Sequence, residues 1–242
     1  MKLVITNNVT QQHLSITFPS FSKKSRIGLA TGSTPLPLYK AIVKKQPDAS
    51  KVTTFNLDEY WPMPHDNPNS YFHYMYTHLF SKIKVKKWHI PNGQTTNIDR
   101  ECKRYNKLLN KPLDIELLGL GKDDHIGFNE PGTSFQTRTH LTTLTQSTIR
   151  ANKKYFTHGH IPKHALTMGP KDIMQAKQLL MIVTGKHKAK TLKKMLCNPI
   201  NPQTPASILR KHNNATVIAD KQAASKIPKR WFDEHPDLFS TS

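Results

Sequence analysis

Acidic residues are scarce in this chain. Only 16 Asp and Glu stand against 36 Lys and Arg in 242 residues, so the formal net charge is +20. A strongly basic protein invites three kinds of partner: nucleic acid, anionic surfaces and phosphorylated ligands. The basic residues fall in short runs along the whole chain, and no segment forms a basic stripe interleaved with aromatic residues. We therefore interpret the charge as a solvated basic surface and expect no specific nucleic-acid partner.

Cysteine and long apolar runs are also lacking. The two cysteines, Cys102 and Cys197, lie far apart in the sequence, which excludes a disulfide scaffold or a cysteine-based zinc ribbon. No run approaches the ~20 apolar residues that a membrane-spanning helix needs. The first residues turn polar too early for a secretory signal. We expect a cytoplasmic protein that does not contact a membrane.

Short β-rich segments alternate with helical patterns along the chain. This alternation is typical of an α/β fold, here a Rossmann-like open, mostly parallel sheet with helices on both faces. The length suits a single domain over residues 1–242, with a lid at about 139–165 and a loose tail from about 230. The sequence predicts strands at 26–30, 52–56, 115–120, 179–184 and 215–220, and helices at 36–45, 71–79, 98–109, 188–197 and 221–225.

A small-residue turn follows the first of these predicted strands. Residues 31–34 read Thr-Gly-Ser-Thr, and Pro35 then suits the opening of a helix. Small residues let backbone N–H groups approach an anion, and the positive end of the helix dipole adds to the attraction. The turn is therefore a candidate phosphate site. An ordinary capped strand-to-helix turn is the alternative.

Two adjacent acids, Asp58 and Glu59, follow the strand predicted at 52–56. An apolar setting raises the pKa of a carboxyl group, so one of the two could act as a base near neutral pH. The alternative is a pair that caps the following turn.

A second acidic cluster surrounds a histidine in residues 119–131, GLGKDDHIGFNEP. Asp123, His125 and Glu130 could come together there. Carboxylates beside a histidine fix its tautomer and raise its pKa, which suits proton shuttling. A metal site is the competing interpretation. Because the spacing matches no common metal motif, we expect no metal.

Six segments together resemble one family. LATGSTP, TFNLDEY followed by DNPNSYF, PNGQTTNIDRECKRY, LLGLGKDDHIGFNEPGTSFQTRTH, IPKHALTMG and VTGKHKA follow one another in the order seen in glucosamine-6-phosphate deaminases. The resemblance runs from about residue 26 to about residue 226. It implies a Rossmann-like fold and the conversion of D-glucosamine 6-phosphate to D-fructose 6-phosphate and ammonia, in amino-sugar catabolism. That reaction needs neither a redox cofactor nor a metal, so we expect no cofactor.

The resemblance also implies roles for individual residues. Asp58 matches the base that moves a proton between C2 and C1 of the sugar, and His125 matches the residue that opens the pyranose ring. Asp123 and Glu130 match the carboxylates that orient this histidine. Beside the base, Glu59 and Tyr60 are expected to bind substrate. The substrate phosphate is expected at Thr31, Gly32, Ser33, Thr34, Lys154 and Lys188.

Some positions depart from the family pattern. Asp124 stands where a glycine is usual, so its carboxylate could raise the pKa of His125, or its Cβ could strain a left-handed backbone. Lys154 stands where an arginine is expected, which keeps the charge but loses the two-pronged contact. His140 and Thr142 occupy positions that are basic in allosterically regulated members. We therefore expect no allosteric effector site, and a monomer or a small homo-oligomer.

Two other functions remain open on the residues alone. A 6-phosphogluconolactonase-type hydrolase would share the sugar-phosphate site but would need no base at C2. A non-catalytic sugar-phosphate sensor would bind the ligand without turning it over.

Overall fold

A parallel β-sheet forms the centre of the molecule. The computed structural model describes residues 1–156 and 160–241. Within these residues eight strands form one sheet in the order β11-β1-β10-β9-β6-β2-β3-β5, and each neighbouring pair is parallel. The strands are β1 (Lys2–Ile5), β2 (Ser25–Leu29), β3 (Val52–Asn56), β5 (Lys87–His89), β6 (Ile115–Gly119), β9 (Leu179–Val183), β10 (Ala215–Ala219) and β11 (Phe239–Thr241).

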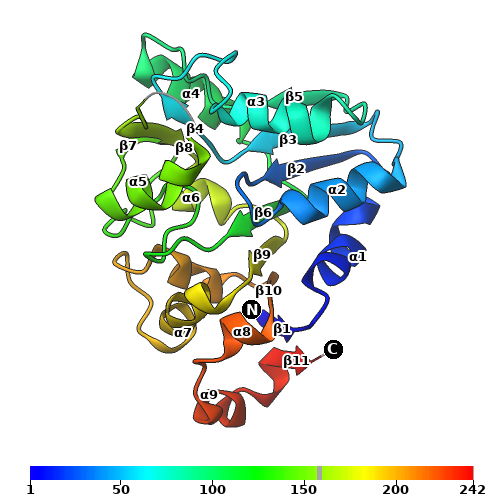
Figure 1. The fold of residues 1–242 in the computed structure, drawn as a ribbon, viewed down its shortest axis with the longest axis vertical. Coiled ribbons are helices and arrows are strands. Elements are labelled where there is room, and N and C mark those ends of the chain that lie inside the picture. The colour runs from blue at the N-terminus through cyan, green and yellow to red at the C-terminus, as the bar shows by residue number, and fades with distance from the viewer. Residues whose placement is uncertain (157–159, 242) are drawn as a thin grey trace.

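Helices cover both faces of this sheet (Figure 1). One buried apolar cluster joins the sheet to the first three helices, and a second joins the other face to α4 and to the helices from α6 onward. The α/β class expected from the sequence is thus confirmed. The helices are α1 (Val9–Phe21), α2 (Leu36–Lys45), α3 (Tyr71–Met75) with the π-helical turn η1 (Tyr76–Phe80), α4 (Ile98–Leu108), α5 (Gln146–Asn152), α6 (Pro170–Ile173), α7 (Ala189–Cys197), α8 (Lys221–Ala224) and α9 (Lys229–Glu234), with 3-10 turns η2 (Lys153–Tyr155), η3 (Lys186–Lys188), η4 (Pro205–Lys211) and η5 (Pro236–Leu238). Among the described residues, none of these helices is long and apolar enough to cross a membrane.

A second, antiparallel sheet lies at one side of the fold. It has the order β4-β8-β7, formed by Asp58–Trp61, His164–Thr167 and His140–Thr143. Strand β7, helix α5 and the first two residues of β8 lie in the segment expected to form a lid, of which residues 157–159 lie outside the described residues. That this segment acts as a lid, and that residues 1–242 form a single domain, stay predictions.

The sequence analysis did not predict β1, β5 and β11, which lie at or next to the edges of the sheet. The five predicted strands match β2, β3, β6, β9 and β10 to within one residue at each end, because these central strands are buried on both faces and read as apolar runs. The segment expected as a loose tail forms α9 and then β11, which pairs with β1. How loosely it is held stays a prediction.

The centre of the sheet contains a buried carboxyl group. Gly28 on β2 pairs in register with Glu116 on β6, and the Glu116 side chain is fully buried. Neither carboxyl oxygen has a hydrogen-bond partner among the described residues. Burial, together with the charge of Asp58, raises the pKa of Glu116 well above its ordinary value, which favours its protonated, neutral form. A Cβ atom at position 28 would lie 2.0 Å from a Glu116 oxygen, so glycine is required there.

We therefore predict that Gly28→Ala destabilises the protein by ~1–3 kcal/mol through overpacking. The measurement is urea unfolding. Gly119→Ala is the matched control, because a Cβ there meets no atom within 4 Å among the described residues. The loss should shrink in a Glu116→Ala background, because the clashing carboxyl is then gone. An equal loss in both backgrounds would contradict the clash as its cause.

Candidate active site

One cavity of about 430 Å³ opens where several central strands end. Its walls come from the loops after β2, β3, β6 and β9, and from α3 and the α5–η2 segment. Because these strands are parallel, their carboxyl ends meet along one edge of the sheet (Figure 1), and ligands of open α/β sheets bind outside that edge.

The loop at residues 31–34 lines one end of the cavity. Gly32 has a φ of 90°, which a residue with a side chain rarely adopts. Two tyrosines hold the loop: Tyr74 Oη donates to the Gly32 carbonyl at 2.6 Å, and Tyr155 Oη donates to Ser33 Oγ at 2.9 Å. Helix α2 then begins after Pro35, whose side chain cannot cap it. The positive end of the helix therefore points to the loop, as in other anion sites.

Cationic side chains line the same end of the cavity. Lys188 donates from Nζ to the Leu120 carbonyl at 2.5 Å. Burial, with the charges of Lys122 and Lys154 nearby, lowers its pKa to about 8. Lys154 and His187 also line the cavity. Lys122 was missed by the sequence analysis, although it sits within the glycine-rich segment that carries Asp123.

Asp58 lines the cavity from the start of β4. Its side chain is almost fully buried. Burial, with the neighbouring charge of Glu59, raises the pKa of Asp58 to about 8, against an opposing effect of His125. A carboxylate with so high a pKa is a stronger base than an exposed one.

Glu59 points away from the cavity, because alternate residues of a strand face opposite sides. Its oxygens accept hydrogen bonds from the backbone N–H groups of Tyr60, Tyr71 and Phe72 at 2.9–3.0 Å. Burial raises its pKa to about 7 in spite of these bonds. Tyr71 and Phe72 are the first residues of α3, so Glu59 caps this helix, which is the alternative considered for the acidic pair. Its predicted contact with substrate stays a prediction, whereas Tyr60 does line the cavity.

His125 lines the same cavity as Asp58, and two carboxylates contact its Nδ1. Its Nδ1 lies 2.5 Å from Asp123 Oδ1 and 3.6 Å from Glu130 Oε2. Burial lowers the pKa of His125, but the hydrogen bonds and charges of Asp123 and Glu130 outweigh it and raise the pKa to about 9. For Asp123 the balance is reversed. Burial raises its pKa, but the hydrogen bond and the charge of His125 outweigh burial and lower the pKa to about 2. With Nδ1 engaged, Nε2 is the ring nitrogen left for substrate.

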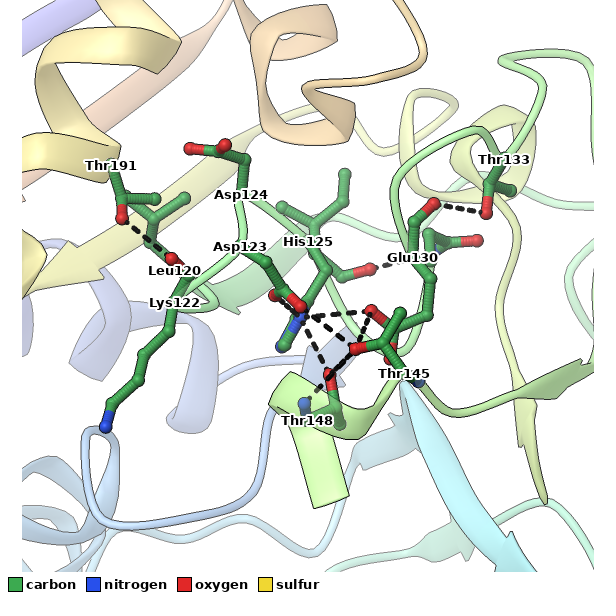
Figure 2. A network of polar contacts seen from close by, with 12 residues as sticks. Leu120, Lys122, Asp123, Asp124, His125, Glu130, Thr133, Thr145, Thr148 and Thr191 are labelled. Carbon is green, nitrogen blue, oxygen red and sulfur yellow. Dashed lines mark hydrogen bonds and ion pairs between the residues drawn. The ribbon is translucent and has the colours of Figure 1, made fainter. Parts of the chain in front are cut away.

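Two threonines of the α5 end complete this network. Thr145 contacts Asp123 Oδ2 at 3.1 Å and Glu130 Oε2 at 3.3 Å through its hydroxyl, and its N–H donates to Glu130 Oε1 at 3.1 Å. Thr148 Oγ1 lies 3.5 Å from His125 Nδ1. Figure 2 shows these groups converging on the imidazole ring. The sequence offered no signal for them, because they lie some twenty residues along the chain from His125.

The same cluster has the composition of a metal site. One ligand atom each from Asp123, His125 and Glu130 lie within 4.8 Å of one another. Each of these side chains also takes part in the hydrogen bonds just described, which a protonated imidazole between two carboxylates explains. The expectation of no metal stays a prediction.

Asp58, His125 and the loop at residues 31–34, all indicated by the sequence, line one cavity. Asp123 and Glu130 lie behind His125, outside the residues that line the cavity. The aromatic wall of the cavity, with Tyr71, Tyr74 and Phe156, was missed, because an aromatic residue in sequence reads as core.

The chain is similar in sequence to known proteins. A family model described as glucosamine-6-phosphate isomerases/6-phosphogluconolactonase matches residues 9–218. Among curated proteins, the chain is 44% identical to a glucosamine-6-phosphate deaminase of Bacillus cytotoxicus and 43% identical to one of Bacillus cereus, each over 218 residues, 89% of this chain and 83% of the relative.

Solved structures show the same fold. A monomeric glucosamine-6-phosphate deaminase, described as a missing link of the NagB superfamily, superposes with a TM-score of 0.88 at 38% identity over 93% of this chain and 100% of that one. A 6-phosphogluconolactonase from Trypanosoma brucei superposes with a TM-score of 0.75 at 18% identity over 94% and 98% of the two chains, and shows the fold alone. The chain belongs to the glucosamine-6-phosphate isomerase and 6-phosphogluconolactonase family.

Proposed function

We propose that this protein converts D-glucosamine 6-phosphate to D-fructose 6-phosphate and ammonia. The observation that carries the proposal is the placement of a buried base, Asp58, and a carboxylate-held histidine, His125, on one cavity that the small-residue loop at residues 31–34 and Lys188 also line. The deaminase relatives at 43–44% identity support the same reaction.

Substrate binding begins with the phosphate. Backbone N–H groups of residues 31–34 and the N-terminus of α2 attract the dianion, and Lys188 adds a charge-assisted hydrogen bond. Fixing the phosphate at this end of the cavity directs the sugar ring toward Asp58 and His125, which line its other part.

His125 then opens the ring. As an imidazolium it gives a proton to O5 as the C1–O5 bond breaks and takes the proton from O1, which leaves an aldehyde at C1. Asp123 and Glu130 stabilise the imidazolium that is present before and after these two transfers.

Asp58 carries out the isomerisation. The C1 carbonyl makes the C2 proton acidic. With the C2 amine neutral, Asp58 removes this proton as the electron pair moves into a C1–C2 double bond and O1 takes up a proton from water. Return of the proton to C1 places a C=N⁺ bond at C2. Water adds to C2 and ammonia leaves, which gives the ketone. These bond changes are proton transfers and a hydrolysis, and no oxidant or reductant enters them.

The protein is proposed to act in the cytoplasm, in amino-sugar breakdown, as a monomer or small homo-oligomer without an allosteric effector site. The structural relative at 38% identity is described as monomeric. His140 lies at the start of β7, and burial lowers its pKa, so this side chain is neutral at pH 7 and does not attract a phosphorylated effector.

The lactonase alternative rests on the shared fold with structures at 16–21% identity, most of which are described as 6-phosphogluconolactonases. Hydrolysis of a lactone requires activation of water and no base at C2. Asp58 therefore separates the two reactions.

Asp58→Asn is predicted to lower the rate of ammonia release from D-glucosamine 6-phosphate by on the order of 10²–10⁴-fold, because the amide cannot accept the C2 proton. Ammonia is measured with purified protein without added metal. Asp66→Asn, at a nearby exposed acid, is the control and should leave the rate unchanged. Ammonia release that persists in Asp58→Asn refutes the assignment of the base. Hydrolysis of 6-phosphogluconolactone by both proteins, with no ammonia released, favours the lactonase.

The same role predicts that the Asp58 carboxyl titrates near pH 8 rather than near 4 in the ligand-free protein. Because its pKa is raised, the carboxylate is present above about pH 8 and is lost as the pH falls through that value. Carboxyl-carbon NMR shifts measured from pH 5 to 10 test this, with Asp58→Asn identifying the signal. A midpoint near pH 4 would contradict the desolvated base.

Lys188→Met is predicted to raise KM by roughly 10- to 100-fold with kcat nearly unchanged. The reason is that Lys188 is expected to bind the phosphate equally well in the ground state and in the transition state. Steady-state kinetics measure both constants. Lys186→Met, at an exposed lysine of the same turn, is the control. A fall in kcat at constant KM would instead place Lys188 in the transition state.

A further inference from the structure

Asp124 lies between the two catalytic residues in a conformation that side chains avoid. Its φ is 70°, one of two left-handed values among the non-glycine residues of the described chain. The residue is nevertheless 97% buried, since only 3% of its surface is exposed. Left-handed backbone is unfavourable for most residues with a side chain, although Asp and Asn adopt it more readily than the others, and a buried carboxylate is unfavourable unless it is paired.

Helix α7 supplies the partner. Lys194 Nζ lies 2.5 Å from Asp124 Oδ2. Burial raises the pKa of Asp124, and Lys194 opposes this effect. The second carboxylate oxygen, Oδ1, has no hydrogen-bond partner among the described residues, so Lys194 is the principal compensation for burying this acid. Figure 2 shows the Asp124 carboxylate directed away from the His125 ring.

The ion pair is the last of three contacts between the α7 region and one loop. Lys188 donates to the carbonyl of Leu120, Thr191 Oγ1 donates to the carbonyl of Lys122 at 3.1 Å, and Lys194 binds Asp124. Residues 188, 191 and 194 of the helical segment therefore contact residues 120, 122 and 124 of the loop, in that order. Lys194 is the only one of the three that binds a side chain at the turn itself.

That turn sets the geometry of the catalytic pair. Its left-handed residue returns the chain, so that the Gly121 N–H donates to the His125 carbonyl at 2.9 Å. Asp123 and His125 are thereby brought to the 2.5 Å contact between Oδ1 and Nδ1. The Ala206 N–H holds the Asp124 carbonyl at 2.9 Å from the other side.

We propose that Lys194 is a positioning residue: by binding Asp124 it fixes the turn that holds Asp123 against Nδ1 of His125. Lys194 does not touch the substrate cavity and acts through the loop. The expected effect on turnover rests on the proposed function, whereas the effect on the Asp123–His125 contact does not.

The test compares Lys194→Met with Lys190→Met, which removes an exposed lysine of the same helix. The first readout is the proton NMR signal of the His125 Nδ1–H, which a short hydrogen bond to a carboxylate moves far downfield. Lys194→Met should lose or shift this signal upfield and lower kcat at least ten-fold, with KM within about two-fold. Lys190→Met and Asp124→Asn should retain both, because asparagine tolerates left-handed backbone and still accepts from Lys194.

A double variant keeps the proposal testable if Lys194→Met does not fold. In Asp124→Gly/Lys194→Met the glycine adopts the turn without strain and no carboxylate is buried unpaired. This variant should fold and recover the Nδ1–H signal and the kcat of the unaltered protein, because a glycine makes the turn without a carboxylate that needs Lys194 as its partner. An unchanged signal and kcat in a folded Lys194→Met, or a folded double variant that recovers neither, overturns the proposal. If the unaltered protein releases no ammonia, the proposed function fails while the NMR comparison still decides the role of Lys194.

Discussion

The contact between His125 and Asp123 is the constraint on which the site depends. An imidazolium ring that is mostly buried is stable only when negative charge lies beside it, and here Asp123 and Glu130 provide that charge at 2.5 and 3.6 Å. These carboxylates in turn need their own donors, which Thr145 supplies from the end of α5. The charge on one ring therefore organises residues from two separate segments of the chain.

Asp58 has the opposite environment. Burial and the neighbouring charge of Glu59 raise the pKa of Asp58, and no salt bridge joins it to a basic side chain among the described residues. The contact with His125 instead lowers the pKa of Asp123. Two acids of the same type thus acquire different chemistry from their surroundings. The difference comes from what each one faces: Asp58 lies at the end of a buried strand, and Asp123 lies in a turn against a histidine.

Part of the high positive charge of the chain is concentrated at the cavity. Lys122, Lys154 and Lys188 bring positive charge to one end of the pocket. Lys188 is also the first of the residues that join the α7 region to the loop that carries Asp123 and His125, so one helical segment contacts both the cavity and that loop. A rigid frame of this kind holds reacting groups in place without a cost at the moment of reaction.

Local sequence determined the central strands, the helices that follow them, and the residue types at the strand ends. Strands β3 and β6 could be predicted because burial on both faces requires continuous apolar residues. Asp58, His125 and residues 31–34 could be singled out because each follows such a strand. The tertiary structure decided which of these groups meet. It turned Glu59 into a helix cap, placed Thr145 on two carboxylates, and bound Asp124 to Lys194, seventy residues further along the chain. Local patterns cannot specify such contacts, because they depend on the packing of α3, α5 and α7 around the ends of parallel strands.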